Sequence, residues 1–264
     1  MLQLTPETYF SSEADKEYMS VSQYHLFTSC ESRALAIING TEKKIESDSF
    51  LQGQLFESLV AGDAQLFMAK HPEMISTRGS TAGQLKAEFQ KVVNAAEKFN
   101  SQKFFTDIIE KCEKQVILTG EICDVPVKCC LDLFDRETCS IYDIKCMSDF
   151  KESWNKQEKK YAPWYYQWGY VLQLAVYREI VKQNFGKEPK EIALLAASKE
   201  EVPDIQAIKF SPEVLNTELV EFKNNIKIYD AIKKGQIEPE HCGTCDYCKK
   251  AKQIINFTEV NSKC

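Results

Sequence analysis

Residues 115–146 decide the fold, and they read QVILTGEICDVPVKCCLDLFDRETCSIYDIKC. Three segments rich in β-branched and other apolar residues, 115–122, 125–133 and 138–146, are separated by short polar stretches that favour turns. This pattern predicts three consecutive strands joined as hairpins. The middle of the chain is therefore expected to form an antiparallel meander.

The segments on either side of this meander have different patterns. Apolar residues at helical spacing predict helices over 21–38, 47–60, 83–112, 163–184 and 213–234, and two further strands are expected over 191–198 and 204–210. This order predicts an α/β (α+β) sandwich, in which helices flank a mixed central sheet. The N-terminal part is expected to be helical, and a cysteine-rich knuckle, residues 238–250, follows the last helix.

The composition is that of a single globular domain. The chain has 264 residues, of which 44% are hydrophobic and 27% charged. We expect one domain over 19–250, a loose lead-in over 1–18 and a tail over 251–264. The net charge of −6 counts mildly against a general nucleic-acid binder. Screening limits the reach of surface charges to about 10 Å, so a local basic groove is compatible with that charge.

The cysteine count and the hydropathy of the sequence indicate in which cellular compartment the protein is expected. The eleven cysteines are an odd number, and the N-terminal residues lack the basic start and apolar run of a signal peptide. The sequence also has no run of 18 apolar residues, so no membrane span is expected. We therefore expect reduced cysteines in a cytoplasmic protein, some of them as metal ligands.

Two carboxylates and a lysine meet on the second hairpin. Side chains alternate along a strand, so Asp143 and Lys145 project from one face and Ile144 from the other. A hairpin centred near 137–138 places Asp132 opposite Asp143, with Cβ atoms about 5 Å apart. Two such close carboxylates repel each other unless a cation lies between them, and Mg²⁺ or Mn²⁺ prefers oxygen ligands. The alternative is two acids and a lysine on a solvated sheet face.

These residues resemble a known family. The run from Gly120 to Asp132, followed by Ile141-Tyr-Asp-Ile-Lys145, is similar to the catalytic hairpin of PD-(D/E)XK nucleases, and most closely to RecE-like and RecB-like phage exonucleases. Leu131 stands where the family motif has proline. The segments from Met19 to Glu31 and from Cys242 to Cys248 resemble the two ends of RecE-like proteins, so the resemblance covers about residues 19–250.

Two further motifs carry the resemblance. Gln173 and Tyr177 match the Q-x-x-x-Y motif of RecB-like nucleases, and their i, i+4 spacing puts both on one helix face. Glu57, in Gly53-x-x-x-Glu57, lies where RecB-like nucleases often have a histidine ligand, and Glu suits Mg²⁺. Each motif taken alone is also compatible with an ordinary helix surface.

The resemblance implies a set of site residues. Glu57, Asp132, Asp143 and the Ile144 carbonyl would bind Mg²⁺ or Mn²⁺, and Lys145 would assist the attacking water. Gln173 and Tyr177 would position the DNA strand. The implied activity is a 5′→3′ exonuclease on linear double-stranded DNA.

The resemblance also implies a setting for that activity, namely phage-type recombination beside a single-strand annealing protein in a bacterial cytoplasm. Relatives of this kind form rings that encircle DNA, so the resemblance also implies a homo-oligomer. A phage origin of the gene is a further implication. The alternatives are a RecB-like nuclease acting on single strands, and a non-catalytic metal-knuckle module that binds DNA or protein.

The cysteine knuckle is a second candidate site. Cys242, Cys245 and Cys248 follow a C-x₂-C-x₂-C spacing, which places three thiolates around one centre. The resemblance suggests Cys30 as the fourth ligand, because several RecB-like nucleases join their chain ends through an iron–sulfur cluster. A [4Fe–4S] cluster is one expectation, and tetrahedral Zn²⁺, with Cys30 or His241 as fourth ligand, is the other.

The segment from Trp154 to Trp168 combines aromatic and basic residues. Lysines can meet phosphates and aromatic rings can stack on bases, so Lys156, Lys159 and Lys160 are candidate DNA contacts. Trp168 and Tyr170 are instead expected to anchor the following helix in the core.

Overall fold

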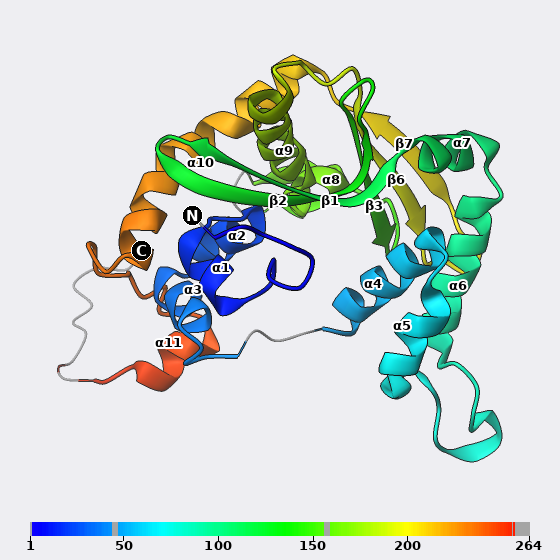
Figure 1. Ribbon diagram of the computed structural model, residues 1–264. Helices are drawn as coiled ribbons and strands as arrows, with labels where there is room; N and C mark the ends of the chain where they lie inside the picture. The colour runs from blue at the N-terminus through cyan, green and yellow to red at the C-terminus, as the bar shows by residue number, and fades with distance from the viewer. Residues whose placement is uncertain (1, 44–46, 156–158, 255, 257–264) are drawn as a thin grey trace.

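The computed structural model describes residues 2–43, 47–155, 159–254 and 256. A five-stranded sheet runs through the molecule, with helices on both of its faces (Figure 1). The strand order is β1-β2-β3-β6-β7, where β1 is Glu113–Ile122, β2 Val125–Asp135, β3 Ser140–Met147, β6 Ile192–Ser198 and β7 Ile205–Lys209. Only β3 and β6 pair in parallel, so the sheet is mixed, as the sequence predicted.

One face of the sheet is covered by α9 (Tyr170–Phe185) and α10 (Pro212–Lys233). Helix α9 is the crossover between the parallel strands β3 and β6, and α10 follows β7. Their apolar faces pack with α2 (Val21–Ser29) and α3 (Glu31–Ile38) against inward-facing residues of the sheet, including Leu131, Ile141 and Leu194. This core is the larger of the two.

The opposite face is covered by α4 (Asp48–Ala61) and α6 (Ala87–Asn100), with α7 (Lys103–Lys111) beside them. Their core contacts on the sheet include Leu133, Tyr142, Ile144 and Leu195. Ile144 thus points away from α9, as strand alternation requires, while Asp143 and Lys145 lie on the α9 side.

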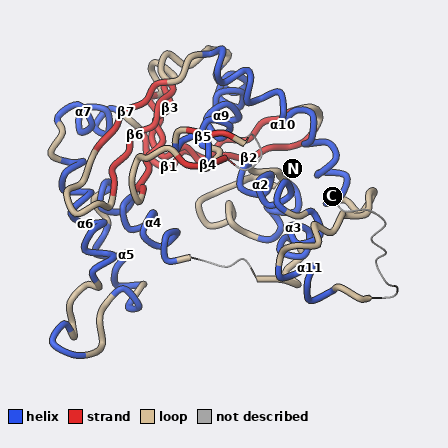
Figure 2. Tube along the Cα trace, turned by 180° about the vertical axis from the view of Figure 1, so that it is seen from behind, coloured by secondary structure: helices blue, strands red, loops and turns tan. Residues whose placement is uncertain are grey.

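Shorter elements complete the chain. Helix α5 and the loop after it project from the body of the protein, as Figures 1 and 2 both show. A two-stranded ribbon precedes α9. These elements are α5 Ala64–Lys70, η1 Pro72–Met74, η2 Gly79–Thr81, β4 Ser153–Asn155, β5 Lys160–Ala162, α8 Trp164–Gln167 and α11 Asp246–Ala251. None of the helices in the described ranges is long and apolar enough to span a membrane.

The N-terminal segment was expected to be a loose lead-in, but it is folded in the structure. Residues 2–18 are folded and contain α1 (Ser12–Glu17), in which Ala14 is fully buried. The Nε2 of Gln23 donates to the carbonyl oxygen of Asp15 (2.9 Å), and Lys128 reaches the same residue from the sheet. Because the segment is mainly polar in sequence, its packing against the rest of the protein was not predicted.

Three of the expected helices are each divided into two. The helix over 21–38 breaks at Cys30, whose backbone is extended (φ −170°, ψ 111°). The helix over 83–112 starts later and breaks at 101–102, and the helix over 163–184 breaks at Trp168–Gly169, where Gly169 has φ +69°. The positive φ of Gly169 suits a residue without a side chain.

Candidate active site

Asp143 and Lys145 lie side by side on β3, facing α9. Asp143 is almost fully buried, at 1% exposure, and the Lys145 ammonium contacts its Oδ2. Burial lowers the pKa of Lys145, but the Asp143 and Asp132 carboxylates outweigh it and raise that pKa above its usual value. Lys145 is therefore a fixed positive charge at this site.

Asp132 lies at an irregular point of the sheet. The β1–β2 ladder omits the pair Gln115–Asp132, and Gln115 has a φ of +52°. The β2–β3 ladder ends at Leu133, one residue beyond Asp132. The Oδ2 of Asp132 instead accepts a hydrogen bond from the Ile144 amide (2.9 Å). This break lets the Asp132 side chain enter the gap between the two strands, next to Asp143.

The inward-facing pattern of β2 also shifts at this point. Cys129 and Leu131 pack into the core under α9, whereas Leu133 packs into the opposite core. Two residues of spacing would normally keep Leu131 and Leu133 on one face. The shift shows that the strand turns about its axis at Asp132. This turn explains why the Asp132 carboxylate points toward β3.

Glu57 completes a set of three acids that we call the carboxylate cluster: Glu57, Asp132 and Asp143. Burial, together with the negative charge of Asp132, raises the pKa of Glu57 to about 8 against the opposing effect of Lys145. Burial and the negative charge of Asp132 raise the pKa of Asp143 to about 7, and Lys145 opposes that shift. Acids from α4, β2 and β3 are thus close enough to influence one another's ionisation.

Gln173 links the cluster to α9. Its Nε2 donates to Oδ1 of Asp143 (2.9 Å) and lies 2.9 Å from the Tyr177 hydroxyl, one helical turn away. The predicted i, i+4 pair thus reaches the carboxylate cluster from the helix that covers it. Gln173 donates to Asp143 directly, whereas Tyr177 is buried, at 9% exposure, and contacts Gln173.

The cluster has the chemistry of a divalent-cation site. The Oδ2 of Asp143 is buried and accepts no hydrogen bond of normal geometry within the described chain; its contact is the Lys145 ammonium. Burial of a carboxylate is costly unless a cation or a proton compensates its charge, and here Lys145 supplies the cation. The carboxylate ligands, together with the Ile144 carbonyl of the same strand, are the oxygen donors that Mg²⁺ and Mn²⁺ prefer, so the residues fit such an ion.

Two neighbours of the cluster were not recognised in the sequence. Tyr170 lies under Lys145, whose Nζ is 4.9 Å from the ring centroid. Burial is the main cause that raises the pKa of Tyr9, from the N-terminal segment, and the negative charge of Asp132 makes a small contribution. Lys128, at 2% exposure, holds Tyr9 from the strand. A lysine inside the apolar run of β2 was a usable signal, because a buried lysine requires partners.

The aromatic and basic segment before α9 is largely exposed. Trp154 and Tyr161 face each other across the β4–β5 ribbon, at 50% and 66% exposure. Trp168 is 58% exposed, so its expected role as a core anchor is wrong, whereas Tyr170 packs against the core. Lys159 and Lys160 lie on the exposed ribbon; Lys156 lies outside the described residues.

The cysteine knuckle converges with Cys30. The sulfurs of Cys30, Cys242, Cys245 and Cys248 all lie within 4.8 Å of one another. Cys30 is the residue between α2 and α3, and the other three follow α10. Among the described residues, these four cysteines are the one set of three or more cysteine, histidine or acidic side chains whose ligand atoms lie this close together. The four sulfurs are therefore closer to one another than the three carboxylates are.

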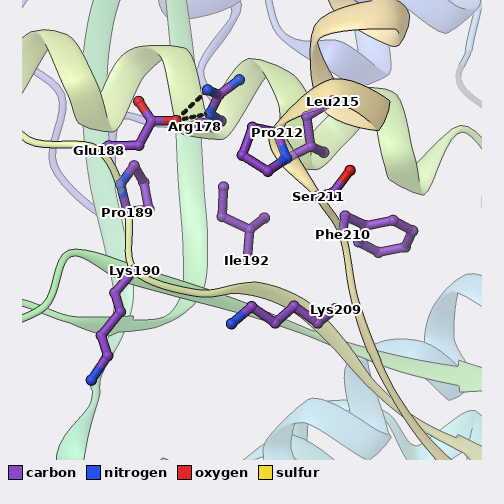
Figure 3. A pocket seen from close by; sticks show the side chains of 10 residues that line it. All are labelled: Arg178, Glu188, Pro189, Lys190, Ile192, Lys209, Phe210, Ser211, Pro212 and Leu215. Atoms are coloured by element: carbon purple, nitrogen blue, oxygen red, sulfur yellow. Dashed lines mark hydrogen bonds and ion pairs between the residues drawn. The ribbon is translucent and has the colours of Figure 1, made fainter.

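A separate pocket of about 410 Å³ lies between α9, the start of β6 and the start of α10 (Figure 3). Arg178 and Glu188 form an ion pair on its wall, and Ile192, Phe210 and Leu215 supply apolar surface. No residue of the carboxylate cluster lines this pocket. The candidate site is therefore defined by its side chains and not by this cavity.

Comparisons with known proteins agree with this geometry. Residues 20–251 match the model of a family described as a PDDEXK-like domain of unknown function (DUF3799). A crystal structure of a candidate exonuclease from Eubacterium rectale is similar over 98% of this chain and 97% of that one, with 30% sequence identity and a TM-score of 0.89. No curated protein matches the sequence.

Proposed function

The chain belongs to the PDDEXK-like family DUF3799, within the PD-(D/E)XK nuclease superfamily, and from this membership we infer that it is a Mg²⁺- or Mn²⁺-dependent deoxyribonuclease. The observation that carries the inference is the meeting of Asp132, Asp143 and Lys145, in which the buried Asp143 Oδ2 contacts the Lys145 ammonium. The hairpin that brings these residues together is the element by which the sequence resembles the superfamily.

Glu57, Asp132, Asp143 and the Ile144 carbonyl are the proposed ligands of the ion. When bound, a divalent ion polarises the phosphate and lowers the pKa of a water molecule. Without it, the Lys145 ammonium is the cation in contact with Asp143. We expect ion binding to draw Asp143 away from Lys145, which leaves the ammonium available to orient the water or to stabilise charge on the phosphate.

Gln173 and Tyr177 act as positioning residues in this proposal. The hydrogen bond from Gln173 fixes the orientation of the Asp143 carboxylate, and the Tyr177 hydroxyl fixes Gln173. Partners of metal ligands restrict how the ligands can turn, and their loss usually weakens metal binding or activity.

DNA is the proposed substrate, in spite of the net charge of −6. Lys159 and Lys160 lie on the exposed β4–β5 ribbon, with Trp154 and Tyr161 beside them. This ribbon leads into α8 and α9, and α9 carries Gln173. Lysines for the phosphates and rings for the bases would allow the ribbon to guide a strand toward the cluster.

The finer assignment is a 5′→3′ exonuclease on linear double-stranded DNA in phage-type recombination. It rests on the RecE-like resemblance of the sequence, and the similar Eubacterium rectale protein, described as a candidate exonuclease, supports the exonuclease part. A homo-oligomer, a single-strand annealing partner and a bacterial cytoplasm belong to the same proposal.

The test is digestion of linear double-stranded DNA labelled at the 5′ or at the 3′ end, with Mg²⁺ or Mn²⁺. We expect metal-dependent release of the 5′ label first, no digestion of closed circular DNA, and loss of activity in Lys145→Ala. Preference for single strands would instead indicate the RecB-like alternative. If no DNA is cleaved under either metal, the enzyme proposal fails and the binding-module alternative replaces it.

A further inference from the structure

The cysteine cluster joins two parts of the chain that are far apart in sequence. Cys30 and Cys248, separated by 218 residues, have sulfurs 3.4 Å apart, and both residues are buried. The sulfur of Cys245 lies 3.8 Å from that of Cys30, and the sulfur of Cys242 lies 3.8 Å from that of Cys248. The ten cysteines that the structure describes, these four included, are free thiols.

These distances discriminate between the two metal centres expected from the sequence. Around one tetrahedral Zn²⁺ with Zn–S bonds of about 2.3 Å, the ligand sulfurs lie about 3.8 Å apart. In a [4Fe–4S] cluster each thiolate binds a different iron, so the sulfurs surround the whole cluster at roughly 6 Å from one another. No pair here exceeds 4.8 Å. The cysteines fit a single ion and leave no room for the cubane.

We propose that Cys30, Cys242, Cys245 and Cys248 bind one tetrahedral Zn²⁺ ion. The four thiolates complete the coordination shell, which makes the site closed and structural. His241 is then a neighbour of the shell and not a ligand. Its Nδ1 lies 3.4 Å from the Cys248 sulfur, where a ring N–H can donate to the thiolate.

Hydrogen bonds to the sulfurs support their role as thiolate ligands, while the sulfur spacing selects the single ion. The Cys245 amide donates to the Cys242 sulfur (3.4 Å), and the Cys248 amide donates to the Cys245 sulfur (3.5 Å). The Thr244 hydroxyl also donates to Cys242 (3.6 Å). Four thiolates on one divalent ion carry a net charge of −2, and such donors disperse it.

The surrounding contacts define what the ion stabilises. Ser32 Oγ donates to the carbonyl oxygens of Pro239 and Glu240, and the Glu240 amide donates to Glu31 (2.8 Å). The start of α3 is thus already bound to the segment after α10. Helices α11 and α3 are in contact in the structure. The ion would fix this junction and hold the two helices together.

Metal analysis of the purified full-length protein, kept in excess Mg²⁺, tests the proposal. We expect one zinc per chain, less than about one tenth of an iron per chain, and no acid-labile sulfide. The same values should follow from anaerobic purification. About four irons with equivalent sulfide, or the absence of any tightly bound metal, would overturn the proposal. Because no DNA cleavage is measured, neither result bears on the proposed nuclease activity.

Variants locate the ion. Cys30→Ser should lower bound zinc at least tenfold, whereas Cys112→Ser, a cysteine outside the cluster, and Asp143→Asn should each retain one zinc per chain. Equal zinc in Cys30→Ser would refute the assignment. If Cys30→Ser does not fold, the wild-type protein reconstituted with Co²⁺ gives the answer. Intense visible absorption of tetrahedral thiolate-bound cobalt is expected, and a weak octahedral spectrum would contradict it.

Discussion

The carboxylate cluster and the cysteine cluster are both candidate metal sites, but they differ in how complete they are without an ion. The four sulfurs already lie at the separations that one tetrahedral ion requires. In the carboxylate cluster, the pKa values of Glu57 and Asp143 are raised, and Lys145 contacts Asp143. A preassembled site binds its ion permanently, whereas an acid site compensated by protons and an ammonium can exchange its ion during a reaction. The following predictions are ordered from the largest expected effect to the smallest.

The largest expected effect separates the two sites by activity. Asp143→Asn should lower DNA cleavage at least about 100-fold, because it removes the most buried proposed ligand of the catalytic ion. The same variant should keep its zinc and its fold, as measured by metal content and circular dichroism. Retained cleavage in a folded Asp143→Asn protein would show that the reaction does not use this cluster.

The converse change is Cys30→Ser, measured by denaturant unfolding. We expect a loss of at least about 3 kcal/mol in the free energy of unfolding, because part of the affinity for a structural ion is folding free energy. Cys112→Ser is the matched control and should lie within about 1 kcal/mol of wild type. A similar small change in Cys30→Ser would mean that the cysteine cluster contributes little to stability.

Gln173→Leu probes the support of Asp143. Loss of the hydrogen bond to Asp143 Oδ1 should reduce activity or metal affinity by about 10- to 100-fold. Tyr177→Phe keeps Gln173 and should have a smaller effect. The apparent dissociation constant for Mn²⁺, measured by activity titration, distinguishes a positioning role from a general loss of folding. An unchanged constant in Gln173→Leu would argue against this role.

The raised pKa values of Glu57 and Asp143 predict a pH dependence of stability. In the folded protein these acids hold protons up to about pH 8 and pH 7, whereas in the unfolded chain they lose them near pH 4. Without added Mg²⁺, the contribution of these two acids to the free energy of unfolding is therefore most favourable below about pH 4. That contribution declines as the pH rises toward 8. Thermal unfolding should show Mg²⁺ stabilising the protein more at pH 8 than at pH 6, and Asp143→Asn should reduce that difference.

The smallest expected effect concerns the junction beside the cysteines. Ser32→Ala removes the hydroxyl that donates to Pro239 and Glu240, at a cost of about 1 kcal/mol. Zinc content should not change, because none of the sulfurs is altered. A loss of zinc in Ser32→Ala would show that the hydrogen bonds, and not the sulfurs alone, hold the site together.

The parts of the fold that the sequence predicted are those that local rules govern. The length of one hairpin predicted the register, in which Leu133 pairs with Tyr142, the residues next to Asp132 and Asp143. Helical spacing likewise sufficed to align Gln173 with Tyr177. The family resemblance supplied Glu57 and Cys30, which no local rule connects to the other site residues. The roles of all these residues stay predictions.

The parts that were missed depend on contacts between distant segments. Helical spacing continues through Cys30, but the backbone there is extended, and the sulfur faces the knuckle. The N-terminal segment is folded because Lys128, far along the chain, binds Asp15 and the Tyr9 carbonyl. Trp168 was expected to be buried from its aromatic character alone, yet it precedes a left-handed glycine at a helix break and is exposed.

The meeting of Cys30 with a partner 218 residues later has a consequence for synthesis. Cys30 leaves the ribosome early, but the last sulfur follows only after every strand of the sheet has been made. A chain that stops short of the knuckle contains every strand of the sheet and every acid of the carboxylate cluster, but only one of the four sulfurs. Completion of the cysteine cluster therefore marks a fully translated domain, and truncated products should be the ones most exposed to proteolysis.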